Sequence, residues 1–278
     1  MNIPPRLIQT SRSRTLDPFS RAAATNLRLL HPDWEYMFFD DADVQDFLRT
    51  HFPEFVSVFE SFKFKIQKYD FFRYLAVYKY GGFYFDLDVL LWRALDELRI
   101  HCSVFPFEEL TINSYLREHL HADWEIGNYA FGARAGDPFL RKIIENCVRA
   151  QRDSTWQRPM LKGIPHIFRA DFEVLTSTGP GLLSRTLFEE SALAQDVTIL
   201  YPNDVRDQES WHQFGNFGMH FMQGSWRTKG SFLRRKLALT WESRVLRRSL
   251  EQSEPLGPRR CLPANITPNP LTSAHASV

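Results

Sequence analysis

The feature that most constrains the fold is a long apolar segment over residues 64–80, followed at once by two glycines. Large apolar side chains occur on most faces of a helix drawn through it, which predicts a buried helix. Gly81 and Gly82 are typical of a left-handed helix end. Phe83 to Phe85 then predict a short strand that ends at Asp86. A buried helix that runs directly into a strand favours a layered α/β fold.

The rest of the chain alternates in the same way. Apolar runs predict strands over 3–10, 34–39, 104–107, 126–131 and 196–201. Helical spacing predicts helices over 19–30, 43–50, 53–62 and 138–150, the last with Asp137 as its N-cap. Strands that alternate with helices are typical of an α/β nucleotide-binding fold.

Asp86-Leu87-Asp88 is the main chemical signal. Side chains at positions i and i+2 of an extended strand point to the same side, so the two carboxylates are expected to converge. Like charges at close range are costly, and a divalent cation such as Mg²⁺ or Mn²⁺ relieves that cost. A solvated turn is the alternative for an isolated Asp-x-Asp, but the apolar run before Asp86 makes a plain surface turn less expected.

Asp70 and Arg73 form a second polar group inside the predicted buried helix. They are three residues apart and share one helix face. Buried charges need a partner or a polar ligand. A structural ion pair and a patch that binds a hydroxyl- or phosphate-bearing ligand are both consistent with this spacing.

Two segments, residues 69–75 (YDFFRYL) and 80–89 (YGGFYFDLDV), carry a family resemblance. Together they resemble the signature of glycosyltransferases with an Asp-x-Asp sugar-binding region, of the Och1-like family 32 type, with a related version in glucosylating toxins. Five further segments resemble family motifs in the same order: 3–10, 34–41, 128–139, 178–181 and 220–226. The ordered resemblance covers about residues 3–227.

The resemblance implies a GT-A-like nucleotide-diphospho-sugar transferase fold, α/β in class, with a mixed central sheet flanked by helices. It also implies a role for individual residues. The resemblance assigns metal binding to Asp86, Asp88 and His220. It assigns catalysis to Asp86, Asp88, Asp70 and Arg73. The donor-binding positions are Gln9 and Thr10 in the nucleotide pocket, Asp70, Arg73 and Asn128 at the sugar, Ser225 and Trp226 at the diphosphate, and also Gly82, Asp86 and Gly179.

Two positions depart from the family pattern. Ile8 and Ser11 stand where the family usually has His and Trp. A contact to the nucleotide base is therefore expected from elsewhere, with Phe38 or Phe39 as candidates. The departure leaves the base of the donor open.

Charge is unevenly distributed along the chain. The net charge is +1, which argues against a nucleic-acid partner. Residues 227–260 hold ten basic and three acidic residues, a net of +7, and the remainder carries 1 − 7 = −6. We expect a catalytic domain over 1–230, a basic amphipathic helix over 231–252 and a disordered tail over 253–278. The helix either packs its apolar stripe on the domain or contacts an anionic membrane.

The predicted activity is retaining, Mn²⁺- or Mg²⁺-dependent transfer of a hexosyl unit from a UDP- or GDP-sugar donor to a glycan or glycolipid hydroxyl acceptor. Residues 108–124 are a candidate acceptor-selecting region. The alternatives are a toxin-like protein glycosyltransferase, a non-catalytic nucleotide-sugar-binding module and a nucleotide-sugar hydrolase. With no signal peptide or long apolar span in the sequence, we expect a cytoplasmic protein, with peripheral membrane contact as a further option.

Overall fold

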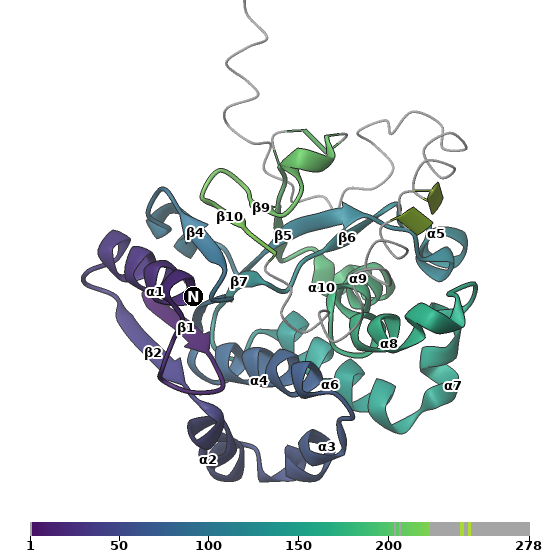
Figure 1. The fold of residues 1–278 in the computed structure, drawn as a ribbon, viewed down its shortest axis with the longest axis horizontal. Helices are drawn as coiled ribbons and strands as arrows, with labels where there is room; N and C mark the ends of the chain where they lie inside the picture. Colours follow the sequence, from purple (N-terminus) through teal and green to yellow (C-terminus); the bar gives the residue numbers. More distant parts are fainter. Residues whose placement is uncertain (1, 203, 206, 223–239, 242–243, 246–278) are drawn as a thin grey trace, which may run out of the picture.

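A mixed seven-stranded sheet forms the centre of the molecule (Figure 1). The computed structural model describes residues 2–202, 204–205, 207–222, 240–241 and 244–245. The strand order is β2-β1-β3-β7-β5-β6, with β8 on β5. β1 runs parallel to β2 and β3, and β7 runs antiparallel to β3 and β5. The strands are β1 (Arg6–Thr10), β2 (Glu35–Phe39), β3 (Gly82–Phe85), β5 (Ser103–Leu110), β6 (Trp124–Ile126), β7 (Ala130–Ala133) and β8 (Val197–Leu200).

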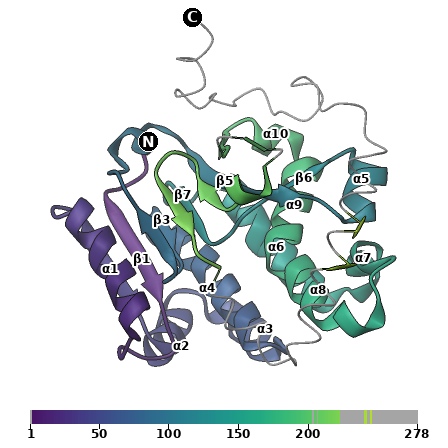
Figure 2. The ribbon, with the colours of Figure 1, turned by 45° about the horizontal axis from the view of Figure 1, so that its top comes forward.

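Helices cover both faces of this sheet (Figure 2). One face packs on α1, and the other packs on a layer that contains α2, α3, α4, α6 and α9. The α-helices are α1 (Pro18–Leu30), α2 (Asp41–His51), α3 (Val56–Ser61), α4 (Lys65–Tyr80), α5 (Ser114–Leu120), α6 (Pro138–Arg152), α7 (Ser154–Gln157), α8 (Arg169–Ser177), α9 (Pro180–Glu189) and α10 (Ser191–Ala194). The predicted α/β class with a mixed, helix-flanked sheet is confirmed.

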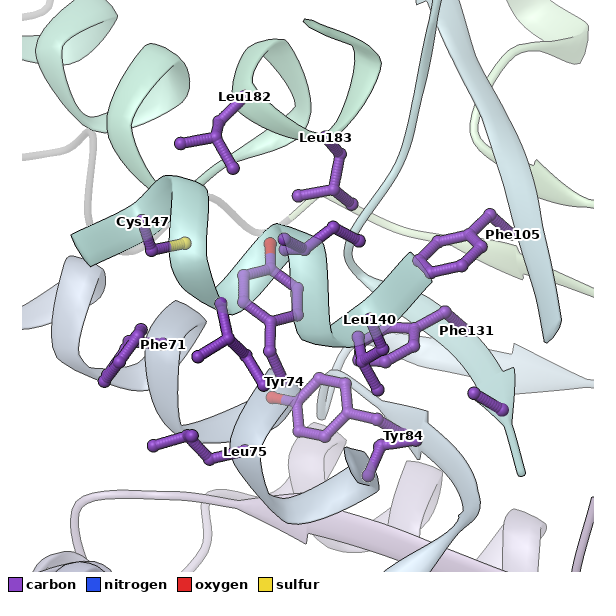
Figure 3. Packing of buried hydrophobic residues seen from close by; sticks show 14 of the residues in the cluster. Phe71, Tyr74, Leu75, Tyr84, Phe105, Phe131, Leu140, Cys147, Leu182 and Leu183 are labelled. Atoms are coloured by element: carbon purple, nitrogen blue, oxygen red, sulfur yellow. The ribbon is translucent and has the colours of Figure 1, made fainter. Parts of the chain in front are cut away.

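Strand alternation divides the core in two. Tyr84 and Phe131 point into the larger cluster, whereas their neighbours Phe83 and Ala130 point into the smaller one. The larger cluster also takes aromatic and aliphatic side chains from α4, α6 and α9, which meet over the sheet in Figure 3. These two apolar layers hold β3 rigidly at the centre, and the predicted site follows its last residue.

The two glycines after α4 set the position of β3. Gly81 has φ +65° and ends the helix, and Gly82 has φ +114°. A side chain on Gly82 would approach the carbonyl oxygen of Arg6 to 2.7 Å. The glycine pair thus lets the chain turn sharply and lets β3 lie beside β1.

Most predicted elements are found within a few residues of their expected bounds. The predicted strand over 126–131 is wrong, because β6 and β7 are separate strands with Gly127 to Tyr129 between them. The amide of Gly127 donates to the carbonyl of Pro106 directly after the last residue of β6. The predicted helix over 53–62 is a 3₁₀ turn, Pro53–Phe55, followed by α3.

A second, three-stranded sheet has the order β4-β10-β9. It contains β4 (Val89–Leu91), β9 (Gln213–Phe214) and β10 (Gly218–His220). β10 pairs antiparallel with β4, with His220 opposite Val89. This pairing returns a late segment of the chain to the residues that follow β3.

The predicted basic helix over 231–252 lies largely outside the described residues, and the predicted tail over 253–278 lies wholly outside them. Thr240, Trp241, Arg244 and Val245 are described and helical. The Trp241 ring packs against Phe168 and Phe172, with centroid distances of 5.5 and 5.9 Å. In the described part of the chain, no helix is both long and apolar enough to cross a membrane.

Candidate active site

Asp86 and Asp88 lie in a tight turn between β3 and β4. The sequence-based expectation of an extended strand at this point is wrong. The amide of Val89 donates to the carbonyl of Asp86 (3.3 Å), which closes the turn, and the amide of Asp86 donates to the carbonyl of Tyr129 (2.7 Å). The convergence of the two carboxylates therefore comes from a turn held at both ends and not from strand alternation.

His220 completes a group of three candidate metal ligands. One ligand atom from each of Asp86, Asp88 and His220 lies within 4.8 Å of the others. His220 Nε2 is 3.2 Å from Asp88 Oδ1, and its ring stacks on Tyr129 at 4.4 Å. Two carboxylates and one imidazole suit Mn²⁺ or Mg²⁺. The three side chains are half-buried, so an ion has access to them.

Arg73 connects this group to the interior. Its guanidinium pairs with Asp70 at 3.1 Å and with Asp86 at 3.2 Å, and it donates to the carbonyl of Asn128 at 2.8 Å. The side chains of Arg73 and Asp70 are 4% and 5% exposed. The ring of Tyr84 lies under the guanidinium, and its hydroxyl donates to Asp86 (2.7 Å). Asp70 and Arg73 therefore form a buried ion pair that extends to the Asp-x-Asp turn.

Asp70 makes polar contacts with three side chains. It accepts hydrogen bonds from Asn128 Nδ2 (3.1 Å) and Thr178 Oγ1 (2.9 Å) besides its pairing with Arg73. Burial raises the pKa of Asp70 to about 6, against the opposing effect of the Arg73 guanidinium. The hydroxyl of Tyr74 joins Asn128 and Thr178 in the same network. Three elements distant in sequence are thereby fixed around one carboxylate.

Gln9 and Thr10, the residues predicted to line the nucleotide pocket, lie at the end of β1. Gln9 is fully buried. It accepts from the Tyr36 hydroxyl (2.9 Å), and its amide lies 3.5 Å from the carbonyl of Asp86. Thr10 donates to the carbonyl of Phe39 (2.9 Å). Gln9 therefore contacts the backbone beneath the Asp-x-Asp turn.

The candidate base-contacting residues lie apart from the metal-ligand group. Phe38 and Phe39 line a surface cavity of about 600 Å³ between β2 and α2. Phe39 also packs edge-on against Phe72 in the core. Arg14 lies over the Phe38 ring at 5.9 Å. Phe38 is thus the better placed of the two for a contact with a flat ligand.

The remaining predicted positions fall into two groups. Gly82 lies against β1, and Gly179 precedes α9, where a side chain would meet Leu175. Ser225 and Trp226 lie outside the described residues. The structure thus brings together six predicted residues: Asp70, Arg73, Asp86, Asp88, Asn128 and His220.

Three tyrosines that the sequence analysis did not select also shape this site. Tyr84 fixes Asp86, Tyr74 joins the Asp70 network, and Tyr129 stacks on His220. Tyr74 directly follows Arg73, and Tyr129 directly follows Asn128. Tyr84 lies two positions before Asp86. That proximity was the only sequence signal, and it does not separate a core tyrosine from a site tyrosine.

A further buried carboxyl group, Glu125 on β6, accepts a hydrogen bond from Thr111. Burial, with a smaller contribution from the nearby Glu108 carboxylate, raises the pKa of Glu125 from 4.5 to about 7, against the opposing effect of the Thr111 hydrogen bond. The folded chain therefore retains a proton that the unfolded chain loses as the pH rises from 4.5 to 7. Stability falls across that range and levels off above it.

We expect Glu125→Gln to remove this pH dependence, since the amide stays neutral and its oxygen still accepts from Thr111. The free energy of unfolding of the variant, relative to that of the unsubstituted chain, should be about 3 kcal/mol higher at about pH 8 than at about pH 4. Urea unfolding at both pH values measures the effect, with the exposed Glu145→Gln as control. If the variant and the unsubstituted chain differed equally in free energy of unfolding at the two pH values, the expectation would be contradicted.

Comparison with known proteins agrees with this geometry. Residues 20–105 match the family model described as "Glycosyltransferase sugar-binding region containing DXD motif". Residues 20–105 therefore resemble the sugar-binding region of this glycosyltransferase family. The matched segment includes Asp70, Arg73 and both aspartates of the Asp86–Asp88 turn.

Curated relatives of this chain carry mannosyltransferase names. Inositol phosphoceramide mannosyltransferase 3 of Schizosaccharomyces pombe is 35% identical over 120 residues, which cover 43% of this chain and 30% of that protein. Inositol phosphoceramide mannosyltransferase 2 of the same organism is 33% identical over 227 residues, which cover 76% of this chain and 58% of that protein. Mannosyl phosphorylinositol ceramide synthase SUR1 of Saccharomyces cerevisiae is 27% identical, and the match covers 66% of this chain and 41% of that protein. The chain thus spans 30–58% of the length of these relatives.

Two solved structures are similar to this chain at low identity. The structure titled PaToxG Glycosyltransferase is 15% identical with a TM-score of 0.45, covering 68% of this chain and 69% of its own. The UDP-bound glycosyltransferase domain from the YGT toxin is 9% identical with a TM-score of 0.43, covering 92% of each chain.

Proposed function

We propose that this chain transfers a hexosyl unit, with retention of configuration, from a nucleotide-diphospho-sugar to a hydroxyl acceptor, and that it uses Mn²⁺ or Mg²⁺. The observation that carries the proposal is the group of Asp86, Asp88 and His220 beside the buried Arg73–Asp70 pair. A divalent cation bound there would neutralise the negative charge of the departing nucleoside diphosphate.

The contribution of the protein is a site that is rigid before the donor binds. Arg73 and Tyr84 hold one Asp86 oxygen each, which fixes the orientation of that carboxylate. Tyr129 holds the His220 ring by stacking. Groups fixed in this way need little rearrangement when charge develops in the transition state. Asp70 and Asn128 lie next to Asp86 and are the groups we assign to the hydroxyls of the donor sugar.

We further propose mannose as the hexose and a glycolipid with an inositol phosphate headgroup as the acceptor. Support comes from the names of the relatives, which include inositol phosphoceramide mannosyltransferases. Transfer of label from GDP-mannose to inositol phosphoceramide in detergent tests both assignments. Label recovered only in protein would favour the protein-acceptor alternative, and label recovered only as free sugar would favour a hydrolase.

Thermal unfolding with UDP or GDP, each with and without Mn²⁺, tests the donor site. We expect one nucleotide to raise the melting temperature only when Mn²⁺ is present. A ligand at 100 times its Kd stabilises the folded state by about 3 kcal/mol. An equal shift without metal would contradict the assigned role of Asp86, Asp88 and His220. No shift with either nucleotide would contradict the proposed function.

A further inference from the structure

Most of the exposed large apolar side chains in the described part of the chain belong to α1 and to the small sheet. They are Leu29 on α1, Trp92 directly after β4, and Phe221 and Met222 directly after β10. Their exposed fractions are 75%, 56%, 48% and 49%, and together they are four of six such residues. Scattered exposed apolar residues are ordinary, but a group of large ones on one surface marks a contact site. We call these four residues the apolar rim.

The small sheet places two members of the apolar rim on one face. β4 and β10 pair residue for residue, and backbone hydrogen bonds continue the ladder by one residue, to Trp92 at one end and Phe221 at the other. Side chains alternate between the two faces of a strand. Trp92 and Phe221 therefore share the face that also carries the half-buried Leu90 and Met219. The opposite face carries Val89, which is fully buried in the smaller core cluster.

α1 lies beside β4 and extends this face (Figure 1). The Asn26 side chain donates to the carbonyl of Leu91 (2.8 Å) and accepts from its amide (2.8 Å), which caps the outer edge of β4. Leu29 lies almost one turn further along the helix. Near the start of α1, the Phe19 ring packs edge-on against Phe221 at 5.6 Å. Contacts near both ends of α1 thus hold it against the small sheet, and the exposed side chains of the two elements form one surface.

The helix that carries Leu29 is basic. α1 contains Arg21 and Arg28, which are both exposed, and it contains no acidic residue after its N-cap Asp17. In a helix of about 3.6 residues per turn, Leu29 lies between Arg28 and Asn26 around the axis. Because Asn26 faces β4, the two arginines lie on the outer side of Leu29. Apolar and basic side chains are therefore neighbours on one exposed face of the molecule.

The apolar rim adjoins the candidate metal ligands. Phe221 directly follows His220, and the amide of Phe221 donates to the carbonyl of Asp88 (2.8 Å). Consecutive residues of a strand point to opposite faces, so the inner face of the small sheet supports the cation site and the outer face carries the rim. The two surfaces meet where the ladder ends, at Phe221 and Met222. A molecule bound along the rim is thus held next to the site.

We propose that the apolar rim, with Arg21 and Arg28, docks the chain on the surface of a bilayer that contains anionic lipid. The inference rests on the proposed function, in which the acceptor is a lipid headgroup, and adds the surface that meets the lipid. Large apolar and aromatic side chains beside arginines are typical of elements that lie in the membrane interface. Attraction of the arginines to anionic headgroups adds to the insertion of the apolar side chains.

Sedimentation of the full chain with vesicles tests this surface. We expect binding to vesicles of phosphatidylcholine with phosphatidylserine, and weaker binding to phosphatidylcholine alone. Leu29→Gln combined with Trp92→Gln should lower the partition coefficient on the mixed vesicles about 10- to 100-fold, because less apolar area is buried. Arg21→Gln should lower it about 5-fold on the mixed vesicles and leave binding to phosphatidylcholine unchanged. Ile167→Gln, an exposed apolar residue before α8, is the matched control, and the melting temperature of each variant checks folding.

Brominated phosphatidylcholine in the mixed vesicles tests whether Trp92 itself enters the lipid. Bromine quenches tryptophan fluorescence only at short range. Trp92→Phe keeps an aromatic side chain at this position, so the variant should bind like the unsubstituted chain and lose the part of the quenching that Trp92 contributes. Equal quenching of the two proteins would contradict the insertion of Trp92 and overturn the proposed docking.

The catalytic readout separates docking from the donor site. In the combined Leu29 and Trp92 variant, transfer from GDP-mannose to inositol phosphoceramide in the mixed vesicles should fall in parallel with binding. The thermal shift with GDP and Mn²⁺ should stay unchanged. If vesicles bind normally but neither GDP nor UDP shifts the melting temperature with Mn²⁺, the proposed function is overturned and the docking surface is supported.

Two further results would overturn the docking surface and leave the donor site untouched. Equal vesicle binding by the combined variant and the unsubstituted chain would assign membrane contact to another part of the chain. A dimer in solution that the combined variant loses, without vesicle binding by the unsubstituted chain, would assign the apolar rim to a second copy of the protein.

Discussion

Asp88→Asn is expected to lower kcat/KM for sugar transfer by about 10²- to 10³-fold and to leave the fold intact. The substitution removes a charge and keeps the volume of the side chain. Asp88 is half-buried in a turn whose closing hydrogen bond is made by backbone groups of Asp86 and Val89, so folding does not depend on the carboxylate. Loss of one preorganised charge at the reacting group has an effect of this size in other enzymes.

The measurement is initial-rate transfer at several Mn²⁺ concentrations, together with the melting temperature. Raised Mn²⁺ should restore part of the activity if Asp88 acts through the cation. Asp46→Asn, an exposed carboxylate on α2, is the control for a general charge effect. Full activity of Asp88→Asn at low Mn²⁺ would contradict a metal-ligand role for this residue.

Arg73→Met is expected to destabilise the fold by about 3–5 kcal/mol, because it leaves Asp70 and Asp86 without their shared cation. For a chain of this size, the melting temperature should fall by about 10 °C. The double substitution Arg73→Met with Asp70→Asn should recover part of the loss, since removing both partners of a buried pair costs less than removing one.

The cycle is measured by urea unfolding of the single and double variants. Arg49→Met is the matched control, because Arg49 pairs with Asp46 on the surface of α2 at 3.3 Å. We expect the control to change stability by less than about 1 kcal/mol. A small effect of Arg73→Met would show that the interior contains enough water or mobility to screen the pair.

The identity of the site residues was largely accessible from the sequence, but their geometry was not. Asp86, Asp88 and His220 were named together through ordered motifs, and the structure brings them together. The strand geometry expected for Asp86 and Asp88 was wrong, because a tripeptide pattern does not distinguish a strand end from a turn. The position of Gln9 beneath Asp86 depends on the pairing of β1 with β3, which the local sequence does not show.

The elements missed include short strands that depend on distant partners, and also several helices, among them α8 and α9. β4 and β10 have three residues each, too short for an apolar period to be visible, and they exist because they pair across the chain. The stacking of Tyr129 on His220 forms only because β10 pairs with β4. The buried helix α4, by contrast, was predictable because its apolar pattern and its glycine end are local.

The small sheet gives the candidate site two levels of local stability. β9 and β10 are only two and three residues long, so the hairpin opens locally at a lower free energy than the seven-stranded sheet. Hydrogen exchange at Met219 and His220 should therefore be faster than at Phe83 and Tyr84. On the proposed function, the measured affinity for the cation includes the free energy of closing this hairpin. Substitutions over residues 208–220 would then weaken cation binding without any change at the two carboxylates.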